Sequence, residues 1–260
     1  MLEPDLHVLV GPSLPQSNRE RLEGGFVFHP PAVRGSLVAI AKCERRNKAP
    51  FVPPVILVID GEFGNGQAIS LTEIRAVINM GATIFGATSI GALRAVEART
   101  VGMTGIGGIF RDYLTGRRVN DSDVAVATSE TGVALGPSVC DVDSLAPAFE
   151  TIHNEPLPIG LIETLRRTYY LDRSYELVHS TMLEYGVPDD VAWRLVFGEH
   201  QDKWAAKSHD AACAISEVWQ WVTGRFAGPC TRDLSSTSFA SPPDLRDLLS
   251  DSVSCGSFIC

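Results

Sequence analysis

A serine at a tight turn is the residue in this sequence best placed to do chemistry. Ser89 lies in the segment 87–91, Ala-Thr-Ser-Ile-Gly, where a short apolar run ends and good helix formers begin. This Ala-x-Ser-x-Gly pattern is one residue short of the Gly-x-Ser-x-Gly nucleophile elbow, in which small flanking residues tolerate a strained turn. The Ser89 hydroxyl could therefore cap the new helix, bind an anion beside its free N–H groups, or act as a nucleophile.

Four further side chains are candidates for binding a substrate. Ser13 lies in a rigid Gly-Pro-Ser-Leu-Pro loop after an apolar run, and Asp60 directly follows the apolar run 55–59. Arg34 is the one charge in a proline-bound loop, where it is either an anion contact or a surface arginine. Since ligands bind at the carboxyl ends of parallel strands, we expect Asp60, Ser89 and Arg94 to converge at one edge of a sheet.

Hydrophobic periodicity predicts the elements that position these residues. Strands at 55–59 and 82–86 alternate with helices at 71–80 and 90–98, and the first of these helices has a capping-box spacing from Ser70 to Glu73. This is a βαβα unit with a right-handed crossover. The fold class predicted is α/β, with a mostly parallel sheet flanked by helices.

Composition divides the chain into four parts. We expect an α/β core over residues 1–128 and a loop or linker over 129–158, which is rich in Gly, Pro and Ser. Helical apolar faces predict a helical C-terminal lobe over 159–224, including a helix from about 202 to 222. The Ser-, Pro- and Asp-rich remainder, 225–260, is predicted to be a mobile tail.

Charge and composition limit the partners. A net charge of −9 argues against nucleic acid, which needs clustered Lys and Arg. The sequence has no apolar run long enough to span a bilayer and no basic leader, so we expect a cytoplasmic protein. The six cysteines form no metal-ligand pattern. The Asp-Ser-Asp at 121–123 is more typical of a turn than of a Mg²⁺ site. Gly105-x-Gly107 lacks the third glycine of a dinucleotide-binding fingerprint. We expect no metal and no cofactor.

Several motifs in order resemble those of the TfuA family, proteins that work with YcaO enzymes in maturing ribosomally made peptides. The serine turn and the helix after it are similar to the family signature Gly-Ala-Ser-Met-Gly-Ala-Leu-Arg-Ala. The likeness covers residues 6–127, and in the C-terminal lobe Lys-Ser-His-Asp-Ala at 207–211 is similar to a Lys-Arg-Arg-Asp-Ala helix. The other motifs that carry it are 11–15, 30–35, 59–61, Gly81, 102–103, Tyr113 and 121–127.

The resemblance implies a role and its partners. These are a YcaO-type cyclodehydratase or thioamide synthase and a precursor peptide, in trifolitoxin-like antibiotic (bacteriocin) biosynthesis. Some family members release sulfide from a thiocarboxylated ThiS-type carrier with a serine-lysine pair, which would make Ser89 the nucleophile. Many members have His-Lys-Glu-Ile where this chain has Leu-Thr-Glu-Ile at 71–74, so Thr72 replaces that lysine and Lys207 is the remaining candidate base.

Two classes of function therefore stay open. One is a hydrolase that releases sulfide from a carrier, and the other is a non-catalytic adaptor that joins a YcaO enzyme to its peptide. A third class, an α/β hydrolase of small esters, lacks a convincing Asp and His order after the serine.

Overall fold

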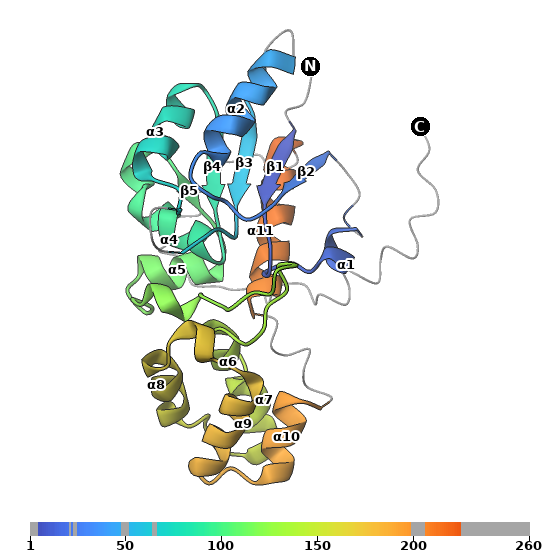
Figure 1. Cartoon of the computed structure of the whole chain (residues 1–260), viewed down its shortest axis with the longest axis vertical. Helices are drawn as coiled ribbons and strands as arrows, with labels where there is room; N and C mark the ends of the chain where they lie inside the picture. The colour runs from blue at the N-terminus through green and yellow to red at the C-terminus, as the bar shows by residue number, and fades with distance from the viewer. Residues whose placement is uncertain are drawn as a thin grey trace.

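The computed structural model describes residues 5–20, 22, 25–47, 52–63, 67–198 and 206–224. It consists of a five-stranded, all-parallel sheet with helices on both faces and a helical region beneath one edge (Figure 1). The predicted α/β class with a mostly parallel sheet is confirmed. The predicted tail, 225–260, lies outside the described residues. No helix within the described part of the chain is long and apolar enough to cross a membrane.

The strands are aligned so that their carboxyl ends lie at one edge of the sheet. The strand order is β2-β1-β3-β4-β5. In register, Leu9 lies opposite Val58, and Val58 lies opposite Gly86. The central strand is buried at all four residues, as its uninterrupted apolar sequence indicates. The strands are β1 (Leu6–Leu9), β2 (Phe26–His29), β3 (Val55–Val58), β4 (Thr83–Gly86) and β5 (Thr104–Gly105).

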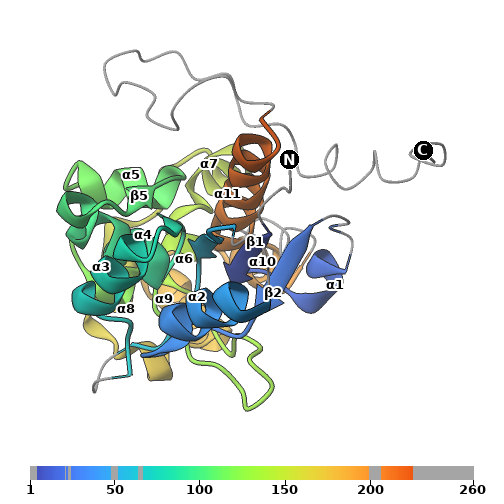
Figure 2. The ribbon, with the colours of Figure 1, turned by 90° about the horizontal axis from the view of Figure 1, so that it is seen from above.

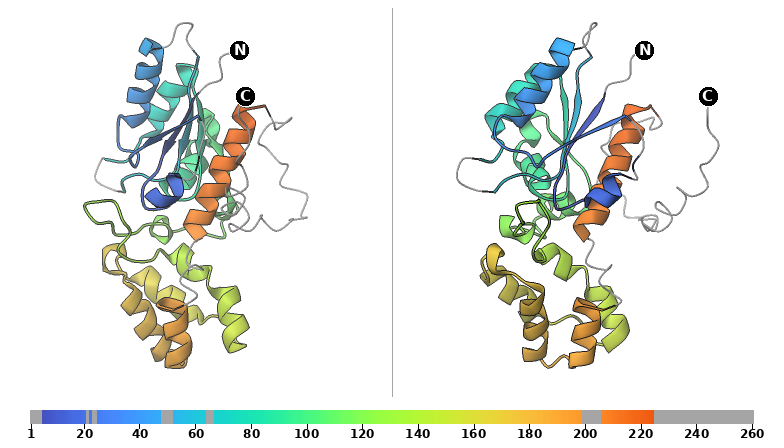
Figure 3. Two further views of the ribbon diagram at one scale, coloured as in Figure 1. Left: turned by 90° about the vertical axis from the view of Figure 1, so that its right-hand side faces the viewer. Right: turned by 45° about the vertical axis from the view of Figure 1, so that its right-hand side comes forward.

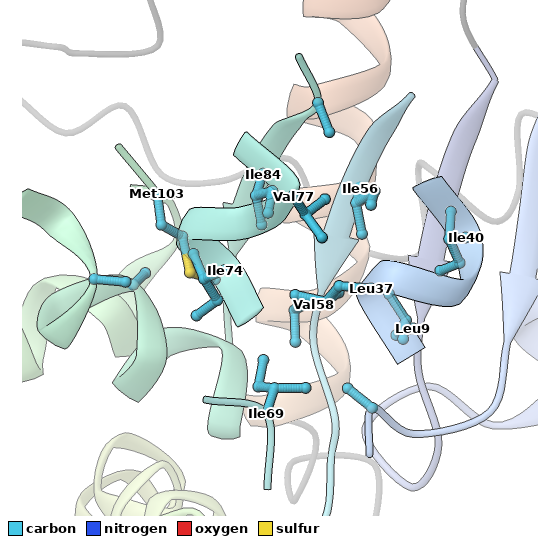
Figure 4. Packing of buried hydrophobic residues seen from close by; sticks show 14 of the residues in the cluster. Leu9, Leu37, Ile40, Ile56, Val58, Ile69, Ile74, Val77, Ile84 and Met103 are labelled. Atoms are coloured by element: carbon cyan, nitrogen blue, oxygen red, sulfur yellow. The ribbon is translucent and has the colours of Figure 1, made fainter. Parts of the chain in front are cut away.

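Two helices cover one face of the sheet. They are α2 (Ser36–Asn47) and α3 (Leu71–Asn79), which lie side by side (Figures 1 and 2). Every second strand residue points toward them, so that Ile56, Val58 and Ile84 pack with Leu37 and Val77 in one buried cluster (Figure 4). Beside β4 and β5, α4 (Ile90–Glu97) packs against α5 (Gly108–Leu114).

The other face of the sheet is covered by the last helix of the described chain, α11 (Ala206–Val222) (Figure 3). Leu57 and Phe85 on this face share a buried cluster with Ile215 and Val218. The sequence placed this helix in a separate helical lobe, but the structure packs it on the sheet. The physical reason is that the strands are apolar on both faces, and the second face needs a cover.

The helical region has a core of its own, which includes Phe149, Leu165, Met182 and Leu195. The segment 129–158, expected to be a loop, contains two helices of this region, and the first of them begins at a capping box between Ser138 and Asp141. Both are too short to show a clear apolar period. The helices are α6 (Val139–Asp143), α7 (Ala146–His153), α8 (Ile159–Arg167), α9 (Tyr175–Glu184) and α10 (Asp189–Val196). Short elements elsewhere are α1 (Gln16–Arg19), η1 (Arg99–Val101), η2 (Asp121–Asp123) and η3 (Tyr170–Asp172).

Glu73 joins α2 to α3. Ser70 caps α3 as predicted, since its hydroxyl accepts a hydrogen bond from the Glu73 amide at 3.1 Å. The Glu73 carboxylate, however, accepts hydrogen bonds from the amides of Gly35 (2.9 Å) and Leu37 (3.0 Å). It therefore satisfies free N–H groups at the start of α2, the neighbouring helix.

We expect Glu73→Ala to lower the free energy of unfolding by about 1–3 kcal/mol, because it leaves two amides at the start of α2 without their acceptor. Urea unfolding followed by circular dichroism measures this change. Thr72→Ala is the matched control, since Thr72 is exposed on the same turn of α3. Equal stabilities of the two variants would contradict the capping role.

Candidate functional site

A cavity of about 230 Å³ lies at the carboxyl edge of the sheet. Its walls come from the segments that follow β1, β3 and β4, from the chain after η2, and from η3 and α11. Asp60, Ser89 and Lys207 all line it, and Tyr170 and Leu171 belong to its wall on the side of the helical region. Residues far apart in the sequence thus meet where parallel sheets bind ligands.

Ser89 occupies the N-cap position of α4 but does not act as a cap. Its side chain makes no capping hydrogen bond, and only 2% of the residue is exposed. Of the three roles that the sequence left open, capping is therefore the one that this geometry does not support. Ser89 lines the cavity instead.

Two glycines allow α4 to begin so close to the sheet. A Cβ atom at Gly91 would overlap the carbonyl oxygen of Val58, and one at Gly86 would overlap the carbonyl oxygen of Gly91. The Gly91 amide donates to the Ile59 carbonyl at 3.1 Å. The Ile90 amide, next to the serine, has no acceptor among the described residues. A free N–H in this position is what an oxyanion hole requires.

The residue before the serine has a strained backbone. Thr88 has a φ of +67°, in the left-handed region that β-branched residues rarely adopt. It is fully buried, and its hydroxyl donates to Asp210 in α11 at 2.8 Å. The turn that carries Ser89 is thus held from the other face of the sheet.

Asp60 is tied to the loop after β1. Its Oδ2 accepts hydrogen bonds from the amides of Gly11 (2.8 Å) and Ser13 (2.9 Å), and its Oδ1 accepts one from the Ser13 hydroxyl (2.6 Å). Both side chains are buried, at 2% and 1% exposure. Ser13 therefore hydrogen-bonds Asp60, and Asp60 positions the loop in which Pro12 lines the cavity.

Lys207 is the buried cation of the cavity. Only 4% of the residue is exposed, and its Nζ donates to the carbonyl oxygen of Val124 at 2.8 Å. Its amide donates to Asp141 Oδ1 at 3.3 Å. No carboxylate among the described residues forms an ion pair with its ammonium group. Lysines are seldom buried in this way without a partner of opposite charge.

Three residues discussed in the sequence analysis do not line this cavity. Arg34 is exposed, and Arg94 forms an ion pair with Glu97 on α4. Neither arginine lines the cavity that Asp60 and Ser89 share, so the expected convergence does not extend to Arg94. Thr72 is exposed on α3 and does not line the cavity either.

A larger cavity of about 370 Å³ adjoins the first. The two share Pro12, Val126 and Lys207 as lining residues. The outer side of the larger cavity is formed by the turn 131–134, whose Val133 is 61% exposed. Lys207 therefore lies at the boundary between the two cavities.

Buried ion pairs hold the helical region against the cavity. Asp123 is fully buried and forms ion pairs with Arg118 at 3.1 Å and Arg166 at 3.0 Å. The two guanidinium groups thus neutralise the carboxylate that was weighed above as part of a Mg²⁺ site. Within the described residues, no group of three or more His, Cys, Asp or Glu side chains could hold a metal ion. Arg173 donates to the Ser122 carbonyl at 2.6 Å, which anchors the segment just after η3.

Comparison with known protein families identifies the central part of the chain. Residues 60–174 match a family described as TfuA-like protein. This region is a TfuA-like domain. The family is associated with YcaO-dependent peptide modification. No curated protein was found to be similar to the chain.

The TfuA-like domain does not include the whole cavity wall. Asp60 and Ser89 lie within the matched residues, whereas Lys207 and Asp210 come from α11, beyond them. Thr88 and Asp210 were missed as site residues from the sequence alone. The available signal was that Asp210 belongs to the motif 207–211, which resembles the family.

We expect Cys140 to be unreactive in the folded protein. Burial raises the pKa of its thiol to about 12, which leaves about one thiolate in ten thousand thiols at pH 8. Iodoacetamide at pH 8, followed by peptide mapping, should modify the exposed Cys43 and leave Cys140 unmodified. In urea both should react. Equal labelling of the two in the folded state would show that the space beside Asp141 is open to solvent.

Proposed function

We propose that this protein acts with a YcaO enzyme on a ribosomally made precursor peptide, and that it supplies sulfide by hydrolysing a thiocarboxylated sulfur-carrier protein. The observation that carries the proposal is that Ser89 and Lys207 line one cavity at the start of α4. The association of TfuA-like domains with YcaO-dependent modification gives the biochemical setting. Thioamidation is the modification that released sulfide would serve.

In the proposed reaction, Ser89 is the nucleophile and Lys207 is the general base, which can accept a proton only after its ammonium group has released one. Lys207 takes the hydroxyl proton as the Ser89 oxygen attacks the thiocarboxylate carbon. The C–S bond breaks, sulfide leaves with that proton, and an acyl-serine remains. Water then attacks the acyl carbon and gives up a proton to Lys207. The bond between the acyl carbon and the Ser89 oxygen breaks, Lys207 returns that proton to the Ser89 oxygen, and the carrier leaves with an ordinary carboxylate. The net change is thiocarboxylate plus water to carboxylate plus hydrogen sulfide, with no other reactant.

The turn around Ser89 supports this chemistry. The free amide of Ile90 follows the nucleophile directly, and the N-terminus of α4 adds its partial positive charge. Both favour the negative oxygen of a tetrahedral intermediate. Only 2% of Ser89 is exposed, so a reacting carbon would have to reach it through the cavity that it lines.

The larger cavity supports a substrate that is the end of a chain. A carrier's reacting carbon is terminal, so the residues before it must run from Ser89 toward solvent. The space beyond Lys207, Pro12 and Val126 offers such a path, and the turn 131–134, with the exposed Val133, lines it. Its volume of about 370 Å³ lies within the range of small-ligand sites.

The second candidate function is an adaptor that binds the YcaO enzyme and its peptide without chemistry. The exposed Thr72, which stands where many family members have a lysine, favours it. The two functions differ in whether purified protein releases sulfide from a thiocarboxylated carrier. The same assay therefore decides between them.

We expect Ser89→Ala to abolish sulfide release and Lys207→Met to lower it at least about 100-fold, the usual contribution of a general base. Sulfide is measured with a fluorogenic probe and carrier thiocarboxylate by intact mass. Matched controls are Ser180→Ala and Lys42→Met, at exposed positions on α9 and α2. If the natural protein releases no sulfide but still stimulates its YcaO partner, the adaptor function replaces the hydrolase.

We expect Ala134→Trp, which fills the larger cavity, to raise KM for the carrier about tenfold, equivalent to about 1.4 kcal/mol of lost binding. Hydrolysis of a small thioacid such as thioacetate should not change, because it needs no path for a chain. Leu135→Trp is the control, since Leu135 is 58% exposed beside the same turn and does not line the cavity. An equal effect on both substrates would place the carrier's tail elsewhere.

A further inference from the structure

Asp210 is a buried carboxylate that the proposed reaction does not use. Only 8% of the residue is exposed, and it lies one helical turn after Lys207 in α11. No lysine or arginine among the described residues pairs with it. A carboxylate in such a place requires compensation from hydrogen bonds.

That compensation comes from two separate segments. Asp210 Oδ2 accepts the hydroxyl hydrogen of Thr88 at 2.8 Å. Its Oδ1 accepts the amides of Gly108 and, at 3.3 Å, Ile109, which begin α5. Burial raises the pKa of Asp210, and these three hydrogen bonds oppose that rise. One carboxylate thus joins α11 to the start of α5 and to the serine turn.

The bond to Thr88 falls on the strained residue of the turn. A threonine at φ +67° is unfavourable, and such a conformation persists only where the surroundings impose it. Glycine would relieve the strain, but it would carry no hydroxyl to bind Asp210. The strained threonine is therefore the residue type that both bends the chain and ties the bend to α11.

We infer that Asp210 is a positioning residue, which holds Thr88 in the left-handed conformation and thereby fixes Ser89 and the Ile90 amide at the wall of the cavity. The inference rests on the proposed function for its catalytic consequence. Lys207 and Asp210 lie three residues apart on α11, so a single helix places the base and fixes the nucleophile. Any shift of α11 along the sheet moves both together.

The test replaces the Thr88 hydroxyl by a methyl group of similar shape. Thr88→Val should lower kcat for sulfide release at least about tenfold and leave KM within about twofold, because the carrier still binds while the nucleophile is misplaced. Thr88→Ser keeps the hydroxyl and should retain most of the activity. Thr181→Val is the control, a buried threonine (2% exposed) in α9, and should not change kcat.

A second readout does not depend on activity. Crystal structures of the Thr88→Val variant and the natural protein should show that the substituted residue has moved to negative φ in the variant and that Ser89 is displaced from the cavity wall. A folded Thr88→Val variant with unchanged kcat, or with positive φ at position 88 and Ser89 in place, overturns the inference. If that variant does not fold, Asp210→Ala, which removes the acceptor of the Thr88 hydroxyl, should show the same loss of kcat, and wild-type kcat there overturns the inference.

Failure of the proposed function and failure of the positioning role would give different results. If the natural protein releases no sulfide, the proposed function fails, and the backbone conformation at position 88 in the variant structures still decides the positioning role. If the natural protein is active and the Thr88 and Asp210 variants match it, the positioning role fails and the proposed function stands.

Discussion

The packing of α11 on the sheet is the contact on which the rest of the structure depends. This helix buries Ala211, Ile215 and Val218 against strand residues, and a fully buried side chain of the size of Ile215 or Val218 contributes about 1.5–3 kcal/mol. The same helix brings Lys207 to the cavity and Asp210 to the serine turn. Apolar burial on one stretch of the helix thus sets the position of its polar residues nearer the N-terminus.

Close approach between backbones is the second constraint. Because Gly86 and Gly91 carry no side chains, α4 begins in contact with the end of β3, and its first amides lie beside the carboxyl edge of the sheet. The strain at Thr88 accompanies this sharp change of direction. The small residues around Ser89 therefore have different structural roles. The glycines let α4 approach the sheet closely, and Thr88 supplies a hydrogen bond.

The sequence predicted the parallel sheet well, because each of its signals is local. The uninterrupted apolar run of β3, the cap at Ser70 and the glycine after α3 act within a few residues of where they stand. The register of parallel strands then brings Asp60 and Ser89 to the same edge, and both line one cavity. Their roles in a reaction remain proposals.

What the sequence could not predict depends on partners distant in the chain. The carboxylate of Glu73 has the spacing of a capping box, yet it binds the start of α2, more than thirty residues away. The place of α11 followed from the need to cover the second face of the sheet, and its own apolar period suits a helical lobe equally well. Thr88 and Asp210 are 122 residues apart, so no local pattern joins them.

The walls of the cavity come from the sheet edge, the helical region and α11, and these parts are held in place by different interactions. Arg173 and the Asp123 ion pairs fix the helical side, because removing one partner of a buried pair leaves a costly unpaired charge. The turn 131–134 of the larger cavity has no ion pair within the described residues and is held by hydrogen bonds to Ser129, whose hydroxyl accepts the Val133 amide at 3.1 Å. A chain end that enters beside this turn would reach Ser89 where α11 and the helical region form the cavity wall. Buried ion pairs and the hydrogen bond from Thr88 to Asp210 lie where a reacting carbon would have to be oriented, and fixed orientation is what proximity catalysis requires.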